Sequence, residues 1–250
     1  MLINTLFTAL IAGWFASVII NYLADTLPIH RRFIKPTCTS CGKAYTVGSY
    51  LFHFKCNNCN HRHGFRQLIT LIIMLVLAFV IFFFSSATAL SKGIDLLVAG
   101  YLLLIIVIDI EHHLVLHTIT AAGSVIFGVL GFKEHGVWPT LLGGIVGFVI
   151  MYLFFILGHF YSQIKSKRSG VEIEDAIGFG DVTFSGVCGL LLGWPNIVAG
   201  LTAGIVLGGV WSLGILFFVL FKKSGDISTS FMAYAPFIAI ATCLLWFLVH

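Results

Sequence analysis

Apolar runs alternate with short polar segments along the whole chain. A helix needs roughly 20 apolar residues to cross the hydrocarbon layer of a membrane. The alternation therefore predicts about eight transmembrane helices with short connections. Their expected ranges are 2–24, 68–90, 94–110, 116–132, 137–161, 182–192, 197–221 and 231–250. The run 182–192 is short for a full crossing.

The composition supports the same fold class. Hydrophobic residues make up 59% of the chain and charged residues only 10%, and the mean hydropathy is +1.04. Such a chain cannot hide its apolar side chains in one water-soluble core, so we expect an all-α polytopic membrane protein. No basic residue precedes the first run and no clear cleavage site follows it, which favours a retained first helix over a signal peptide.

One long polar segment interrupts the pattern between the first two runs. Residues 30–67 contain seven basic residues, four cysteines and almost no aliphatic run. We therefore expect a first transmembrane helix over 1–29, a soluble insert over 30–67 and a seven-helix membrane bundle over 68–250.

The basic residues predict an orientation. If the eight expected helices alternate in direction, all 14 Lys and Arg residues except Lys92 and Lys133 fall on one side. The positive-inside rule makes that side cytoplasmic and puts both termini outside. No basic face with interleaved aromatic residues is present, so no nucleic-acid partner is indicated.

Four cysteines in the insert form two Cys-x-x-Cys pairs. Cys38 and Cys41 are followed, after fourteen intervening residues, by Cys56 and Cys59. This spacing is typical of a tetrahedral four-thiolate Zn²⁺ site with a structural role. Two disulfides are the alternative, but structural disulfides are rare in the reducing cytoplasm. We expect a small cytoplasmic zinc-ribbon-like insert.

Two aspartates stand at the expected cytoplasmic ends of apolar runs. Asp109 closes the run 94–110, and Asp181 follows Gly178 and Gly180. Each aspartate taken singly is also consistent with an ordinary residue at the membrane interface. Glycines permit unusual backbone conformations and close approach of another segment. Two carboxyl groups that share a site cannot both ionise easily, and together they can activate a water molecule.

Other acidic residues are weaker candidates. Glu111 lies two residues beyond Asp109 and would point roughly 200° around the same helix. A hydrophilic loop carries three acidic residues that are expected to be solvated and that could attract a basic peptide. They are Glu172, Glu174 and Asp175.

Several motifs together resemble a known family, the type IV prepilin peptidases, which are GxGD-type membrane aspartic proteases of type IV pilus, type II secretion and competence systems. The motifs are Asp109-x-Glu111-His112, Gly178-x-Gly180-Asp181-Val182, the two cysteine pairs, Asn21 with Leu27-Pro28, and Tyr234-Ala235-Pro236-Phe237. Their order and spacing carry the resemblance over essentially the whole chain.

The resemblance implies a function. Asp109 and Asp181 would be the catalytic pair, and the four cysteines would bind zinc. The enzyme would lie in the lipid bilayer of the bacterial inner membrane and cut the basic leader from prepilins or pseudopilins after a glycine, on the cytoplasmic side. It would then methylate the new N-terminus with S-adenosylmethionine.

The chain departs from the family pattern at three places. Val115-Leu116-His117 lacks the usual proline and aspartate, Thr183 replaces a common lysine, and 63–67 differs from the usual stretch after the second cysteine pair. The last change weakens the methyltransferase expectation more than the peptidase expectation. The alternative function is a small proton-coupled transporter or channel that uses the same carboxylates as a relay.

Overall fold

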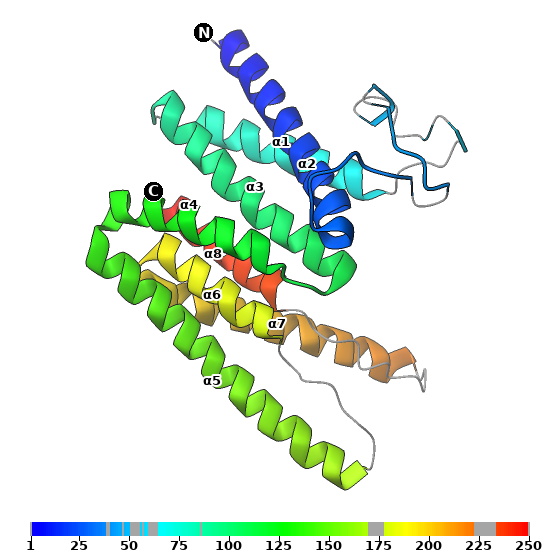
Figure 1. The fold of residues 1–250 in the computed structure, drawn as a ribbon. Helices are drawn as coiled ribbons and strands as arrows, with labels where there is room; N and C mark the ends of the chain where they lie inside the picture. Colours follow the sequence, from blue (N-terminus) through cyan, green and yellow to red (C-terminus); the bar gives the residue numbers. More distant parts are fainter. Residues whose placement is uncertain are drawn as a thin grey trace. The chain divides into compact units, whose positions relative to one another are not determined.

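The computed structural model describes residues 2–38, 41–46, 48–50, 56, 58–59, 65–85, 87–169, 178–222 and 234–249. These residues form eight α-helices and no β-strand (Figure 1). The helices are α1 (Leu2–His30), α2 (Phe65–Phe84), α3 (Ala89–His112), α4 (His117–His135), α5 (Val137–Ser169), α6 (Phe179–Leu192), α7 (Asn196–Lys222) and α8 (Ala235–Val249). The predicted all-α architecture is confirmed for this part of the chain.

Five of the described helices, α1, α2, α3, α5 and α7, are long and apolar enough to cross a membrane. The apolar helices α6 and α8 have only 14 and 15 residues. A helix of that length spans about 22 Å, less than the roughly 30 Å of a hydrocarbon core. The eight crossings therefore remain a prediction.

The first helix runs further than expected. Pro28 lies inside α1, which continues to His30. A proline lacks the N–H group of one helical hydrogen bond, but here only two helical residues follow it. The helix then ends at Arg31, whose φ is 51° and whose N–H donates to the carbonyl of Leu27 at 3.1 Å.

The expected ranges 68–90 and 94–110 imply a turn at 91–93. This prediction is wrong, because residues 91–93 lie at the start of α3. The connection lies just before, where hydroxyl groups satisfy the free backbone N–H groups. Ser85 Oγ accepts from the N–H of Ala87 at 3.2 Å, and Thr88 Oγ1 accepts from that of Ser91 at 3.4 Å. Lys92 reaches back, and its Nζ donates to the carbonyl of Phe82 at 3.1 Å.

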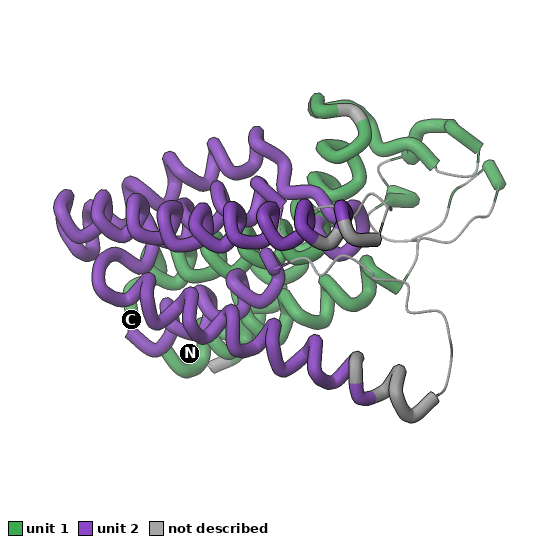
Figure 2. The backbone as a smooth tube through the Cα atoms, turned by 90° about the horizontal axis from the view of Figure 1, so that it is seen from below, with its two compact units in different colours: residues 1–108 green, residues 109–250 purple. Residues whose placement is uncertain are grey.

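The chain divides into two compact units, residues 1–108 and residues 109–250, coloured separately in Figure 2. In unit 1, α1 and α2 pack closely, since a Cβ on Gly13 would lie 2.9 Å from the carbonyl oxygen of Met74. The buried Asn21 Nδ2 donates to Thr70 Oγ1 at 2.7 Å across the same pair. The predicted boundaries at 29/30 and 67/68 remain predictions.

Helix α6 is the centre of unit 2, where it packs against α4, α5, α7 and α8. Glycines let the backbones touch. A Cβ on Gly189 of α6 would lie 2.2 Å from the carbonyl oxygen of Gly143 of α5, and one on Gly147 would lie 2.5 Å from that of Ser185. Small residues allow this close approach of helices in membranes. The contact fixes α6, which carries Asp181.

The backbone contact predicts the effect of one methyl group. Gly189→Ala should lower the free energy of unfolding by about 1–3 kcal/mol, as overpacking does, because a backbone oxygen cannot move aside. Gly128→Ala in α4 is the matched control, since a Cβ there has no atom within 4 Å. Thermal unfolding in detergent measures both, and an unchanged midpoint for Gly189→Ala would contradict the contact.

Candidate active site and metal centre

Asp181 lies in the first turn of α6 and is 6% exposed. Its carboxylate accepts hydrogen bonds from the backbone N–H groups of Tyr234, Ala235 and Gly178. Ala235 begins α8 and Tyr234 directly precedes it, so the N-terminal ends of two helices face this side chain. Helix N-termini favour negative groups, and the three donors fix the orientation of the carboxylate.

Asp109 lies near the end of α3 and is 3% exposed. Its carboxyl group interacts electrostatically with that of Asp181, and both residues belong to unit 2. Its Oδ2 atom is buried and has no hydrogen-bond partner among the described residues. A buried polar atom without a partner is uncommon in proteins. The structure thus brings the two aspartates into one buried site and leaves one oxygen open.

The segment after Asp109 lies against the motif Gly178-x-Gly180-Asp181. His113 has a φ of 50° and donates its N–H to the carbonyl of Asp109 at 2.8 Å, which ends α3. Val115 then packs on Gly180, where a Cβ would lie 2.7 Å from the Cβ of Val115. Leu116 begins α4 without a side-chain cap. This turn therefore holds the two motifs together without the proline and aspartate of the family pattern.

Of the two glycines in the motif Gly178-x-Gly180-Asp181, only Gly180 lies at a close contact that requires a glycine. Gly178 has φ −78° and ψ 144°, which any residue adopts. Gly180 is also absent from the residues with positive φ. The expected conformational freedom is therefore not used, and Gly180 is required by the close approach of Val115 instead.

Phe179, between the two glycines, is held by aromatic rings of α5. Its ring packs edge-on against Phe148 and Phe155, with centroids 6.5 and 6.0 Å away. Edge-to-face pairs contribute roughly 0.5–1.5 kcal/mol each. The sequence analysis gave Phe179 no role, and these contacts help to position the start of α6.

Among the other acidic candidates, the structure describes only Glu111. Glu111 is exposed, as its predicted direction implies, and its Oε2 lies 4.0 Å from Nε2 of His112. Thr183 donates its hydroxyl to the carbonyl of Gly180 at 2.9 Å. The three acidic loop residues Glu172, Glu174 and Asp175 lie outside the described residues.

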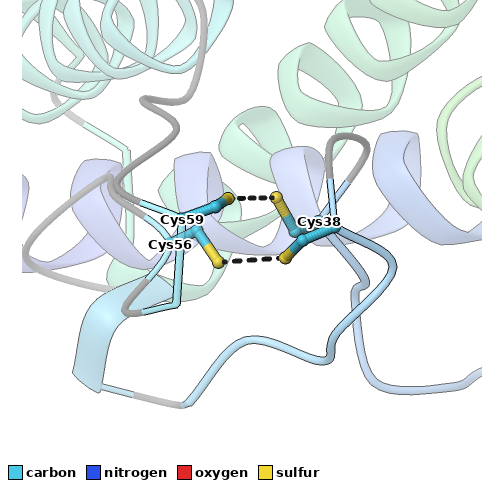
Figure 3. A group of neighbouring side chains, drawn as sticks. Cys38, Cys56 and Cys59 are labelled. Atoms are coloured by element: carbon cyan, nitrogen blue, oxygen red, sulfur yellow. Dashed lines mark hydrogen bonds between the residues drawn. The ribbon is translucent and has the colours of Figure 1, made fainter.

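The four cysteines of the insert gather in unit 1. Their Sγ atoms lie within 4.8 Å of one another, and the side chains converge in Figure 3. The Sγ atoms of Cys38 and Cys59 lie 3.6 Å apart, as do those of Cys41 and Cys56, and none of the four forms a disulfide. Zn–S bonds of about 2.3 Å in a tetrahedron put sulfurs about 3.8 Å apart. The cluster therefore fits a metal such as zinc.

Tight turns shape the cluster. An antiparallel bridge joins Thr37 to Ala44, and the turn closes at Gly42, whose φ is +69° and whose N–H donates to the carbonyl of Cys38 at 2.8 Å. On the other side, backbone N–H groups of Asn58 and then Cys59 lower the pKa of the Cys56 thiol. Stabilised thiolates are the form that binds metals.

Tyr45 supports the cluster from beside it. Its hydroxyl group hydrogen-bonds to Cys38, and burial followed by this bond raises the pKa of Tyr45. The phenol therefore keeps its proton and remains a donor to the sulfur. Such outer contacts orient metal ligands.

A polar contact that the sequence analysis missed joins the insert to the helices. Tyr50 Oη donates to Asp25 Oδ2 at 2.5 Å, and Arg66 forms an ion pair with the other carboxylate oxygen of Asp25. Burial and then the Asp25 charge raise the pKa of Tyr50. Asp25 interrupts an apolar stretch, which indicates a polar partner, but the sequence does not indicate that this partner is Tyr50.

The fold and the site define a helical membrane-type protein with two adjacent buried carboxyl groups. The chain belongs to the type IV leader peptidase family, whose model matches residues 96–244, more than half of the chain. This assigns it to the peptidases and confirms the resemblance read from the motifs. The matched range contains Asp109 and Asp181 and begins after the four cysteines of the insert. No curated protein and no solved structure matches the chain.

The cysteine geometry predicts the metal content. The purified protein should carry about one zinc ion per chain, and Cys41→Ser should lose most of it because a closed site needs all four thiolates. Cys243→Ser, outside the cluster, should keep the metal. Elemental analysis measures the content, and equal zinc in Cys41→Ser and the unaltered protein would rule out the four-thiolate site.

The contact between Gly180 and Val115 predicts unequal effects of two neighbouring substitutions. Gly180→Ala should reduce leader cleavage by about 100-fold, since a displacement of 1 Å at a catalytic group can cost that much. Gly178→Ala should reduce cleavage much less, because the nearest atoms to its added Cβ would lie at 3.9 Å or beyond. Cleavage rates of the two variants measure the difference, and equal rates would contradict it.

Proposed function

We propose that this chain is an aspartic endopeptidase that removes the basic leader from type IV prepilin-like proteins after a glycine, on the cytoplasmic side of the bacterial inner membrane. One observation carries the proposal: Asp109 and Asp181 are buried together within the range matched by the leader peptidase family. The family supports peptidase activity, and the paired carboxyl groups support its aspartic type.

The two carboxyl groups have complementary surroundings. Asp181 is held by three backbone donors, whereas Oδ2 of Asp109 is free of partners among the described residues. Two carboxyl groups at one buried site share protons, so that one acts as base and the other as acid. In the proposed reaction the pair takes a proton from water as it attacks the scissile carbonyl and returns a proton to the leaving amine.

The substrate proposal follows from charge and hydropathy. The apolar segment of a prepilin or pseudopilin would lie between the helices, beside the site. Its basic leader would be attracted by Glu172, Glu174 and Asp175. The distribution of basic residues supports the orientation proposed here, with the site at the cytoplasmic side and both termini outside.

We extend the proposal to N-methylation of the new N-terminus with S-adenosylmethionine, as the resemblance to the family implies. One observation supports the alternative function, a proton-coupled transporter or channel. Asp95 of α3 is a further buried carboxylate in a candidate membrane helix. It lies 14 residues, or about 21 Å, from Asp109 along α3. The peptidase family match favours cleavage over transport.

Carboxylate-to-amide substitutions test the pair. Asp109→Asn and Asp181→Asn should each abolish cleavage of a prepilin, since an amide cannot exchange the proton. Glu111→Gln is the matched control, because Glu111 is an exposed carboxylate of the same helix end, two residues from Asp109. It should cleave at close to the normal rate.

The assay uses purified protein, a prepilin and labelled S-adenosylmethionine, so that shortening and label incorporation are measured separately. Metal content and thermal unfolding show whether each variant remains folded. Cleavage at the normal rate by a folded Asp109→Asn or Asp181→Asn variant would disprove the aspartic mechanism.

A further inference from the structure

A cavity of about 830 Å³ lies in unit 1 between α1 and the insert. This is within the range of about 300–1,000 Å³ typical of sites for small ligands. The lining is mostly apolar and aromatic, with one lysine. It comprises Val18, Ile19, Tyr22, Phe33, Ile34, Lys35, Pro36, Ala44, Tyr45, Thr46 and Tyr50. The matched family range begins at residue 96 and does not include this cavity.

One wall of the cavity belongs to a candidate membrane helix. Val18 and Ile19 lie within the apolar stretch Ile3–Ile29 of α1, and Ile19 is 43% exposed. The end of that stretch lies ten residues beyond Ile19, about 15 Å along the helix. The opposite wall comes from the insert. The cavity therefore extends from the apolar stretch of α1 to the polar insert.

The segment that closes the cavity alternates basic and apolar side chains. Arg31, Arg32 and Lys35 are exposed, as are the intervening Phe33 (75%) and Ile34 (38%). Basic residues with apolar neighbours at the end of a membrane helix bind anionic lipid headgroups. Long basic side chains can also place their charge at the interface while their stems cover apolar surface.

The polar side chains that line the cavity differ in their hydrogen bonding. The hydroxyl of Tyr22 donates to the carbonyl of Ile34 at 3.1 Å, and that of Tyr50 donates to Asp25. Lys35 has no hydrogen bond or ion pair within the part of the chain that the structure describes. A lysine ammonium next to an apolar cavity matches a ligand with a negative group joined to an apolar chain.

We propose that this cavity binds an anionic phospholipid. Its phosphate contacts Lys35, and an acyl chain lies against Val18, Ile19 and Phe33. A soluble anion would satisfy the lysine but would leave the exposed apolar wall uncovered. A zwitterionic lipid would cover the wall but would add a positive group to a basic segment.

The cavity also depends on the cysteine cluster. Ala44, Tyr45 and Thr46 follow directly on the first cysteine turn, and Tyr45 contacts both Cys38 and the cavity. Lipid binding should therefore weaken when the cluster is disrupted. The binding does not require the peptidase reaction, so the two proposals succeed or fail separately.

The test measures lipid retention by the full chain. Delipidated protein is incubated in mixed micelles with equal amounts of phosphatidylglycerol and phosphatidylcholine, and bound lipid is counted by native mass spectrometry. The unaltered protein should retain phosphatidylglycerol in clear excess. Lys35→Gln should lower its phosphatidylglycerol affinity about fivefold, the effect of about 1 kcal/mol for one basic residue near a membrane surface.

Matched variants separate charge from shape. Ile19→Trp should fill the cavity and reduce retention of both lipids, and Val18→Phe serves the same purpose if Ile19→Trp does not fold. Lys133→Gln removes an exposed lysine of α4, far along the chain, and should retain lipid normally. Metal content and unfolding midpoint show that each variant is folded.

Three outcomes would overturn the proposal. One is equal retention of the two lipids by the unaltered protein. Another is unchanged phosphatidylglycerol retention in folded Lys35→Gln and in a folded cavity-filling variant. Displacement of bound phosphatidylglycerol by glycerol phosphate at equal concentration would likewise show that the site recognises only a soluble anion.

Discussion

Direct backbone contact between α5 and α6 is the constraint on which unit 2 depends. Gly143, Gly147 and Gly189 remove the side chains that would otherwise separate the two helices. Since the contact involves carbonyl oxygens that cannot move aside, it sets both the rotation and the depth of α6. Gly189 lies eight residues from Asp181, about 12 Å along the helix. The glycine contact therefore helps to place Asp181, whose carboxylate is oriented by three backbone N–H groups.

In both units hydrogen-bond donors hold a carboxyl group in place. Asp25 is satisfied by Tyr50 and Arg66, and Asp181 by three backbone N–H groups. Asp109 differs, because one of its oxygens has no partner in the described chain. Satisfied carboxylates stabilise the arrangement of segments around them. An unsatisfied one costs free energy, and such a cost is expected where a site awaits water or substrate.

The sequence predicted the helices, the cysteine cluster and the proximity of the two aspartates. Long apolar runs and ligand spacing are local signals. The membrane orientation that the basic residues indicate stays a prediction. The contacts of Gly180 with Val115 and of Asp25 with Tyr50 were not predictable, because they join segments distant in sequence. The connection before α3 differs from the predicted one, because the Ser85 and Thr88 hydroxyl groups accept backbone hydrogen bonds there and α3 begins at Ala89.

The hydrogen bonds from Tyr234 and Ala235 to Asp181 have a consequence for biosynthesis. α8 is the last helix that the structure describes. The N–H groups of Tyr234 and Ala235, at its N-terminal end, complete the surroundings of Asp181, which lies more than fifty positions earlier in the chain. A nascent chain that has inserted α1 to α7 still lacks these donors. Maturation of the site therefore follows translation of the C-terminal helix, and partly synthesised chains in the membrane hold an incomplete site.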